Sequence, residues 1–322
     1  MTQTKAGLLS LIAACTIWGL SPLFYHALAP VAPVEILAHR TLWSLVFLGA
    51  VVLATGRGRL LSQALRAHFG LIAGAAVAIS VNWLVFISSV QMDRATEASL
   101  GYFVFPLVAV ALGRLFLGEQ LGRLQAVAVG LAAAAVGLLS WGLGAAPWIA
   151  LALGLSFGLY GLLKKRLPVP GVVSVLAEVV ILAPLAVAAL VALHGGFWAM
   201  ARPVGIFGHD LWLSLLLVAS GPITGVPLLL FSRATQAVSM ATVGLVQYLN
   251  PTLQFLVATL VFVEPFTPWH ALAFGMIWLA LALYTLAAWR GNGARARPAV
   301  PSQPSAAASP SSSAATSGTR IR

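Results

Sequence analysis

Four side chains that can carry charge stand in or beside strongly apolar stretches of this chain. Glu35, His39 and Arg40 lie close together, and Glu178 lies well inside a separate apolar run. A charge in a membrane costs roughly 2.5–3.5 kcal/mol unless it is paired or faces water, so each is a functional candidate. Glu178 is expected either to pair with a cation such as Arg40 or to titrate as a proton carrier. Glu35 and His39 could form a proton-sensitive pair, and the alternative is a cluster that reaches the outer surface of the membrane.

Two further groups combine neutral hydrogen-bonding side chains with aromatic rings. They are Asn82 with Trp83 in one apolar segment, and Gln247, Tyr248 and Asn250 in another. Such a mixture suits a pocket for a small amphipathic solute, whose apolar body stacks on the rings while its polar groups fix its orientation. Hydrogen bonds that only join helices are the alternative.

A repeated proline segment predicts two interrupted helices. A shift of 145 residues brings Pro106 onto Pro251, each inside an apolar run and each followed 13 residues later by a glutamate. A proline lacks an N–H and leaves the carbonyl four residues earlier, of Tyr102 or of Gln247, without its helical partner. Corresponding interruptions in two halves of a membrane protein point to a transport site, whereas isolated prolines would only kink their helices.

A further interruption is expected in the segment 221–227, which reads Gly-Pro-Ile-Thr-Gly-Val-Pro. Pro222 and Pro227 predict a broken helix, and the Thr224 hydroxyl could satisfy the backbone that the prolines set free. The sequence therefore predicts a hinge at this segment.

The composition identifies a membrane protein. Hydrophobic residues make up 60% of the chain and charged residues 8%, and the mean hydropathy is +0.98, so a soluble globule could not bury this much apolar surface. Ten apolar segments approach the roughly 20 residues that cross a bilayer. They are 7–28, 34–54, 69–90, 96–117, 122–141, 147–164, 172–193, 211–231, 240–262 and 268–288. The predicted fold class is therefore an all-α membrane protein with ten transmembrane helices.

The distribution of positive charge predicts the orientation. The net charge is +11, and with the N-terminus in the cytoplasm all of the 18 lysines and arginines except Arg40, Arg94 and Arg202 fall on the cytoplasmic side. The positive-inside rule therefore places both termini in the cytoplasm of a multi-pass protein of the bacterial inner (plasma) membrane. This distribution explains the charge without a nucleic-acid partner.

Two halves of five segments each follow from the repeated proline segment. Residues 7–141 and 147–288 are the expected repeats, and because five is odd the second half enters the membrane inverted relative to the first. A weaker match at a shift of 139 puts Trp18 near Phe157. Residues 290–322 are expected to form a disordered basic cytoplasmic tail, because their composition changes to Pro, Ser, Ala and Arg.

Several short strings within these halves match a known family. They are His39–Ser44, Asn82-Trp83, Glu97–Phe103, Tyr160–Leu162, Pro227–Leu229 and Gln247–Thr252. On these strings the chain resembles the EamA repeats of the drug/metabolite transporter superfamily, and within it the RarD branch, over about residues 5–288. The resemblance implies a ten-helix inner-membrane permease with a central cavity that exports a small metabolite or drug-like compound. One departure is Phe105, where the family usually has an asparagine that Asn250 retains in the second half, so a more apolar pocket is expected.

These observations favour a secondary transporter of small metabolites or amphipathic drug-like compounds that works by alternating access, with proton coupling left open. The chain has no phosphate-binding G-x-x-x-x-G-K-[ST] loop, so ATP is not expected to drive it. Its six histidines are scattered and its cysteine is single, so neither a metal nor another cofactor is expected. The alternatives are a polytopic membrane enzyme that acts on a lipid-like substrate and a passive channel. The sequence sets neither the substrate, nor the direction of transport, nor the oligomeric state.

Overall fold

The computed structural model describes residues 3–117, 122–143, 147–195, 205–238 and 246–295. The regular secondary structure of these residues is helical. Within these ranges no strand occurs. The helices are α1 (Gln3–Gly19), α2 (Ser21–Ala27), α3 (Pro33–Ala54), α4 (Gly58–Ala67), α5 (Phe69–Gln91), α6 (Ala95–Leu117), α7 (Arg123–Leu143), α8 (Trp148–Lys165), α9 (Gly171–His194), α10 (Leu211–Ala237), α12 (Leu249–Leu256), the π-helix η1 (Val257–Val261) and α13 (Pro268–Arg295).

The helices confirm an all-α membrane protein. Seven stretches are long and apolar enough to cross a bilayer: Thr4–Ala27, Pro33–Ala54, Phe69–Gln91, Arg123–Gly142, Gly171–His194, Leu211–Phe231 and Pro268–Leu286. Three apolar helices are shorter: Ala95–Val108, Trp148–Lys164 and Leu249–Val261. Every one of these stretches overlaps an apolar segment predicted from the sequence, and the total of ten crossings stays a prediction.

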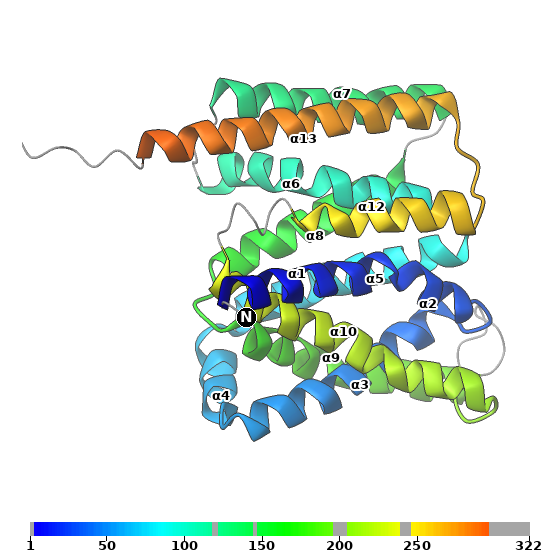
Figure 1. The fold of residues 1–322 in the computed structure, drawn as a ribbon. Helices are drawn as coiled ribbons and strands as arrows, with labels where there is room; N and C mark the ends of the chain where they lie inside the picture. Colours follow the sequence, from blue (N-terminus) through cyan, green and yellow to red (C-terminus); the bar gives the residue numbers. More distant parts are fainter. Residues whose placement is uncertain (1–2, 118–121, 144–146, 196–204, 239–245, 296–322) are drawn as a thin grey trace, which may run out of the picture.

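The helices pack mainly across the chain rather than with their sequence neighbours. α7 packs on α13, α3 on α9, and α6 on α12. α1 lies against α10 and α12, α8 lies against α5 and α6, α3 also contacts α10, and α5 contacts α9. Figure 1 shows α7 and α13 along one edge of the bundle and α3, α9 and α10 along the opposite edge. The start of α1 and the end of α13 lie at the same end of the bundle (Figure 1).

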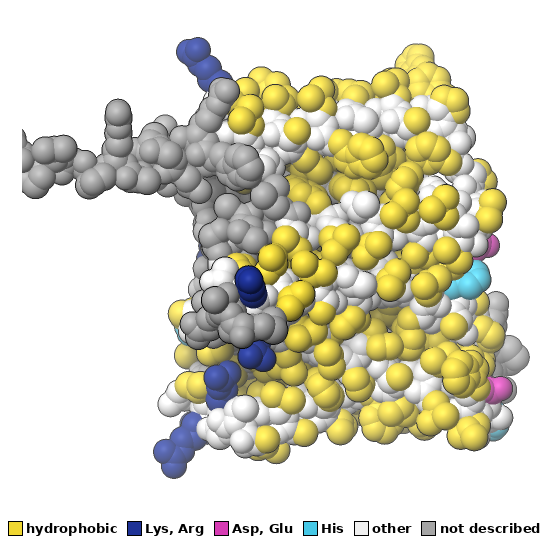
Figure 2. Space-filling view, in the orientation of Figure 1, with side chains coloured by type: hydrophobic (Ala, Val, Ile, Leu, Met, Phe, Trp, Pro, Cys, Tyr) yellow, Lys and Arg dark blue, Asp and Glu magenta, His cyan; other side chains and the backbone are white. Residues whose placement is uncertain are grey.

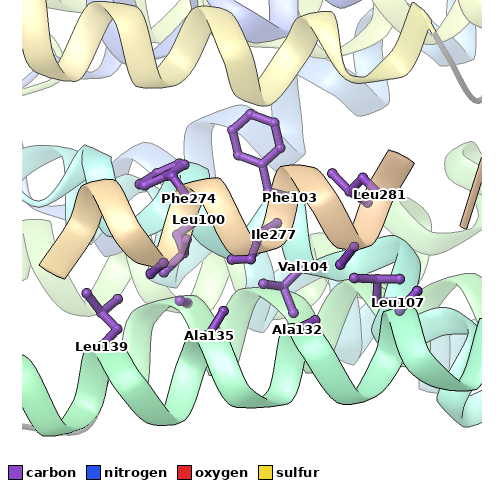
Figure 3. Close-up of a cluster of buried hydrophobic side chains, with 14 residues drawn as sticks. Leu100, Phe103, Val104, Leu107, Ala132, Ala135, Leu139, Phe274, Ile277 and Leu281 are labelled. Carbon is purple, nitrogen blue, oxygen red and sulfur yellow. The ribbon is translucent and has the colours of Figure 1, made fainter. Parts of the chain in front are cut away.

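The core between α6, α7 and α13 shows how the sequence brings these helices together. Phe103 of α6 and Phe274 of α13 meet edge to face, with ring centroids 5.7 Å apart. Buried alanines of α7, at positions 128, 132 and 135, lie on the face that packs into this cluster (Figure 3). Small side chains let helices approach closely in lipid, where packing rather than water exclusion holds them together.

A short helix that the sequence analysis treated as a connection follows α3. In α4, Ala64 is buried in a cluster with Leu167 and Ala177, whereas Arg59 and Arg66 are exposed. This amphipathic pattern is typical of a helix that lies along a membrane surface, with arginines toward anionic lipid headgroups. The helix has only 10 residues, which is about half of the roughly 20 that cross a bilayer.

The expected break in the segment 221–227 is wrong, because α10 runs through both Pro222 and Pro227. The helix is held against α3 at this point: a Cβ on Gly221 would lie 2.5 Å from the backbone of Trp43. Close packing against a neighbouring helix can support a proline-containing helix in a membrane. A hinge role for these prolines stays a prediction.

The expected role of Thr224 is also wrong. Its hydroxyl donates to the carbonyl of Ser220 at 2.8 Å. The carbonyls that lose their helical donor are those four residues before each proline, at Val218 and Ile223. A threonine in a helix normally reaches the carbonyl four residues before itself, so its own position decides its partner.

The two repeated prolines differ in their setting. Pro106 lies inside the continuous helix α6. Pro251 lies in the first turn of α12, directly after a turn at Tyr248. A proline in a first turn removes no helical hydrogen bond, because N–H groups there have no partner within the helix. Of the two repeated prolines, Pro106 alone is therefore inside an unbroken helix, and the interruption predicted there is wrong.

The C-terminal boundary also differs from the prediction. α13 continues to Arg295, so residues 290–295, which the sequence assigns to a disordered tail, are helical. The first residue beyond them without an N–H is Pro298, so nothing in this stretch forces the helix to stop at position 290. The remainder of the predicted tail, 296–322, lies outside the described residues.

The packing of α10 on α3 gives a stability prediction. Gly221→Ala should lower the melting temperature in detergent, because the new Cβ would press on the Trp43 backbone and overpacking costs about 1–3 kcal/mol. The matched control is Gly49→Ala in α3, where a Cβ meets nothing within 4 Å and alanine is the better helix former. Equal melting temperatures for the two variants would contradict the close contact.

Candidate functional site

A row of five aromatic side chains crosses the bundle from α2 through α5 and α6 to α8. Ring centroids are 5.8 Å apart between Tyr25 and Phe86, and 5.6 Å apart between Phe86 and Tyr102. The row continues from Tyr102 to Phe157 at 5.8 Å and from Phe157 to Tyr160 at 5.9 Å. We call these five residues the aromatic row. Tyr25 and Phe86 are buried and the other three rings are half-buried, so the row is an apolar part of the interior that carries hydroxyl groups at intervals. Such a combination is of the kind that suits amphipathic molecules.

Arg40 stands at the α2 end of the aromatic row. Its Nη1 donates to the Tyr25 hydroxyl at 2.7 Å, and its guanidinium carbon lies 3.8 Å from the ring centre of Trp83. The residue is only 6% exposed, and a cation over an indole is worth about 2 kcal/mol or more when desolvated. We call Tyr25, Arg40 and Trp83 the arginine cluster. Arg40 and Trp83, which the sequence analysis proposed separately as site residues, are thus in contact, and Tyr25 was not among the predicted residues.

A second charged group lies at the α8 end of the row. Lys164 Nζ is 2.6 Å from Glu178 Oε1, and the Tyr160 hydroxyl donates to Glu178 Oε2 at 3.2 Å. The Ser174 hydroxyl donates to Glu178 Oε1 at 3.1 Å and also contacts Lys164 Nζ. Glu178 is 1% exposed, so its charge depends on these partners. We call Tyr160, Lys164, Ser174 and Glu178 the lysine–glutamate cluster.

Glu178 therefore pairs with a cation, as one of the two expectations stated, but this cation is Lys164 and not Arg40. α4, which follows the end of α3, packs beside the start of α9 through Ala64 and Ala177. α3 and α9 consequently begin at opposite ends of the bundle, and a residue early in one lies far along the axis from a residue early in the other. Figure 1 shows α2 and α4 at these opposite ends.

Asn82 joins the middle of the aromatic row to two helices. Its Oδ1 accepts from the Tyr102 hydroxyl at 2.8 Å, and its Nδ2 donates to the Leu153 carbonyl at 3.1 Å and to Ser156 Oγ at 3.0 Å. It is 1% exposed, so these bonds satisfy a buried amide. In this conformation Asn82 and Tyr102 join α5, α6 and α8, which is the structural alternative weighed for Asn82 from the sequence.

Phe105, which stands where an asparagine was expected, adds a ring to this region. Its ring centroid lies 4.6 Å from that of Phe157, and the side chain is half-buried. The contact supplies apolar surface and no hydrogen-bonding group. This agrees with the expectation of a more apolar environment at Phe105.

Glu35 and His39, which were predicted as a pair, both contact the segment that precedes α10. Glu35 Oε1 accepts from the backbone N–H of Ile206 at 2.8 Å and of Phe207 at 3.0 Å, and the His39 ring lies 4.4 Å from that of Phe207. Both side chains therefore fasten the segment before α10 to α3. Among the described residues, no three His, Cys, Asp or Glu side chains are grouped as metal ligands would be.

The three candidates from the second polar group lie on another part of the bundle. Asn250 Oδ1 accepts from Gln254 Nε2 at 3.0 Å, within α12. Tyr248 packs against the cluster of α6, α7 and α13, and Gln247 is half-buried beside it. In the described chain, the hydrogen bonds and ring contacts of these residues do not reach the aromatic row. Their place in a binding site stays a prediction.

Glu264 has a role that the sequence analysis missed. Its two carboxylate oxygens accept from the backbone N–H groups of Ala95 at 2.6 Å and Thr96 at 2.7 Å, at the start of α6. A carboxylate there satisfies N–H groups that have no partner within the helix and interacts favourably with the helix dipole. The repeated proline segment singled out Glu264 and Glu119, but Glu119 lies outside the described residues.

Tyr25 and Lys164 were also missed as site residues. A tyrosine inside a span and a lysine beside Lys165 and Arg166 both have ordinary explanations, as packing and as positive-inside charge. The signal that relates them is the shift of 139, which brings Tyr25 onto Lys164.

This chain is similar to known membrane transporters in sequence and to a solved structure in fold. The profile of the EamA-like transporter family matches residues 5–141. "Protein RarD" of Streptomyces exfoliatus is 43% identical over 291 residues, covering 89% of this chain and 90% of that protein. An "uncharacterized transporter" of Vibrio cholerae is 38% identical over 287 residues, covering 88% and 93%. A crystal structure with 20% identity superposes with a TM-score of 0.58, covering 89% of this chain and 99% of that chain, which shows a shared fold.

The buried ion pair gives a second stability prediction. Glu178→Ala or Lys164→Ala alone should lower the melting temperature, because each leaves an unpaired charge and breaking a buried pair costs up to about 3–5 kcal/mol. The double variant Lys164→Met with Glu178→Leu should recover most of this loss, since it removes both charges and refills the volume. Additive losses in the double variant would show that the two side chains do not stabilise each other.

Proposed function

We propose that this chain, a membrane transporter that belongs to the EamA-like transporter family in its RarD branch, is a secondary transporter. In this proposal it moves small metabolites or amphipathic drug-like compounds by alternating access. The observation that carries this proposal is the aromatic row with one charged cluster at each end. The row offers apolar surface to the body of a solute, and the clusters hold helices together at the two ends.

The packing of the helices supports two inverted halves. Five helices of the first half each have a counterpart in the second half. When counterparts are exchanged, every principal pair of packed helices becomes another such pair or stays the same. The counterparts are α1 and α8, α3 and α9, α5 and α10, α6 and α12, and α7 and α13. For example, α1 on α10 becomes α8 on α5, and α3 on α9 is unchanged. The family profile, which ends at residue 141, also matches the boundary predicted for the first half. Inverted halves of this kind provide alternating access when one rocks against the other.

The shift of 139 relates one member of the arginine cluster to one member of the lysine–glutamate cluster, because it brings Tyr25 onto Lys164. It also brings His39, the neighbour of Arg40, onto Glu178, whereas Arg40 itself falls on Val179. In this proposal each cluster closes one end of the path, and the ends open in turn. Proton coupling would act at Glu178, because a proton there removes the charge that Lys164 Nζ contacts at 2.6 Å.

The surface charge supports the proposed orientation. Figure 2 shows lysine and arginine side chains gathered at one end of the bundle and acidic and histidine side chains at the other. The basic end is the one at which α1 starts and α13 ends (Figure 1), and it carries the exposed Arg57, Arg59 and Arg66 of the α4 region. The positive-inside rule then places this end in the cytoplasm and the arginine cluster toward the outside.

The transport proposal is tested in proteoliposomes with a pH gradient and a panel of amino acids, nucleobases and amphipathic drugs. We expect at least one compound to accumulate against its gradient, and Glu178→Gln to abolish the pH-dependent part because the side chain can no longer exchange a proton. Asp93→Asn is the matched control, since Asp93 is exposed in the connection between α5 and α6. Flux that only equilibrates the compound would indicate a channel, and undiminished coupling in Glu178→Gln would remove that residue from the mechanism.

The orientation is tested by cysteine labelling in intact bacterial cells. In a Cys15→Ser background, His209→Cys should react with a membrane-impermeant maleimide, and Ser62→Cys in α4 should react only after the cells are permeabilised. Both positions are exposed, and Cys15 itself is buried. The reverse labelling pattern would place the termini outside.

A further inference from the structure

Arg40 is a buried cation whose described partners are neutral. Its hydrogen bond goes to the Tyr25 hydroxyl and its face lies over Trp83. Its Nε is buried and has no hydrogen-bond partner. A buried donor without a partner costs free energy, and a buried charge without a counter-charge costs more. The arginine cluster is therefore electrostatically incomplete.

The acids of this chain are engaged elsewhere. Seven acids are present in the sequence, and Glu119 lies outside the described residues. The six described acids bind backbone N–H groups, pair with another cation or are exposed. They are Glu35 on Ile206 and Phe207, Glu97 with Arg94, Glu178 with Lys164, Asp210 on Leu213, Glu264 on Ala95 and Thr96, and the exposed Asp93. Among described residues, no carboxylate compensates Arg40.

The geometry of the guanidinium decides how a counter-charge could reach it. The face toward Trp83 is covered by the indole, at 3.8 Å from its ring centre. Its N–H groups point outward in the guanidinium plane, where Nη1 bonds Tyr25 and Nε bonds nothing. A carboxylate that approaches in this plane can accept from Nε and supply the missing negative charge. A water molecule could accept the hydrogen bond but would leave the charge uncompensated.

The surroundings of Arg40 also describe the rest of the ligand. Phe86 and Tyr102 continue from Tyr25 as edge-to-face rings, so apolar and aromatic surface lies next to the cation. A single guanidinium balances a single negative charge. These features fit an organic monoanion with an aromatic or otherwise apolar body.

We propose that Arg40 binds the carboxylate of an aromatic or apolar organic monoanion, with the body of the ligand on the neighbouring aromatic row. The inference rests on the proposed transport function and names the substrate class of that site. An anionic ligand on Nε then completes the arginine cluster, which joins α2 to α3 through the Tyr25 hydroxyl.

The test uses three probes with the same phenyl group and side chains of similar length: 3-phenylpropionate, its amide and 3-phenylpropylamine, with charges of −1, 0 and +1 at neutral pH. Binding to the purified full chain in detergent is followed by calorimetry. We expect the carboxylate to bind about tenfold to a hundredfold more tightly than the amide, as for a hydrogen bond to a charged group. Arg40→Gln should abolish this preference, whereas Arg40→Lys should keep part of it because the charge remains without the planar fork.

Arg94→Gln is the matched control, because it removes an arginine that is paired with Glu97 and is partly exposed. It should leave the preference for the carboxylate unchanged. If Arg40→Gln does not fold, the comparison of the three probes on the unmodified chain and on Arg40→Lys still decides the question. Equal binding of amide and carboxylate, binding of none of the three, or a preference that survives in Arg40→Gln would overturn the inference.

The two proposals fail in different ways. Accumulation of the amide or the amine in proteoliposomes, without a preference for the carboxylate, would leave the transporter standing and overturn the carboxylate site. Arg40-dependent binding of the carboxylate, with no compound accumulated from the panel or the probes, would keep the site and overturn transport.

Discussion

The cost of a charge or an unpaired polar group in hydrocarbon governs the arrangement of this protein. The chain meets this cost in several ways: Glu264 accepts backbone N–H groups at the start of α6, and Glu178 pairs with Lys164. Glu35 fastens the segment before α10 to α3. Glu264 and Glu35 join segments that are distant in sequence, and Glu178 joins the consecutive helices α8 and α9, so satisfying the charge also fixes the packing of helices. Arg40 differs, because its described partners carry no charge.

This difference separates structural from functional polar groups. A buried polar group whose hydrogen-bond and charge partners are all in place stabilises one arrangement of the helices. A group that needs a ligand, or that can lose its partner, allows the helices two arrangements. In the transport and binding that we propose, a proton opens the lysine–glutamate cluster and an anion completes the arginine cluster, and the two clusters lie at opposite ends of one aromatic row. In the transport we propose, these two local electrostatic changes bias which end of the bundle is closed.

The sequence predicted some features of the site and fold but not others, for identifiable reasons. Arg40 and Glu178 stood out because a charge within an apolar run is rare, yet their partners Tyr25 and Lys164 have commonplace positions. α4 was missed because it is short and amphipathic. The break at Pro222 and Pro227 was wrong because a proline weakens a helix locally, while contact with α3 supports it.

The sequence by itself determined that this is a membrane protein, where its apolar helices lie, its family, and which intramembrane charges need an explanation. Composition and the length of apolar runs suffice for the first two, since a bilayer imposes them along one dimension. The tertiary structure alone decided that Glu178 pairs with Lys164 and not with Arg40, and that five rings from four helices form one row. Those contacts join residues through space, and local patterns do not say which faces of distant helices meet.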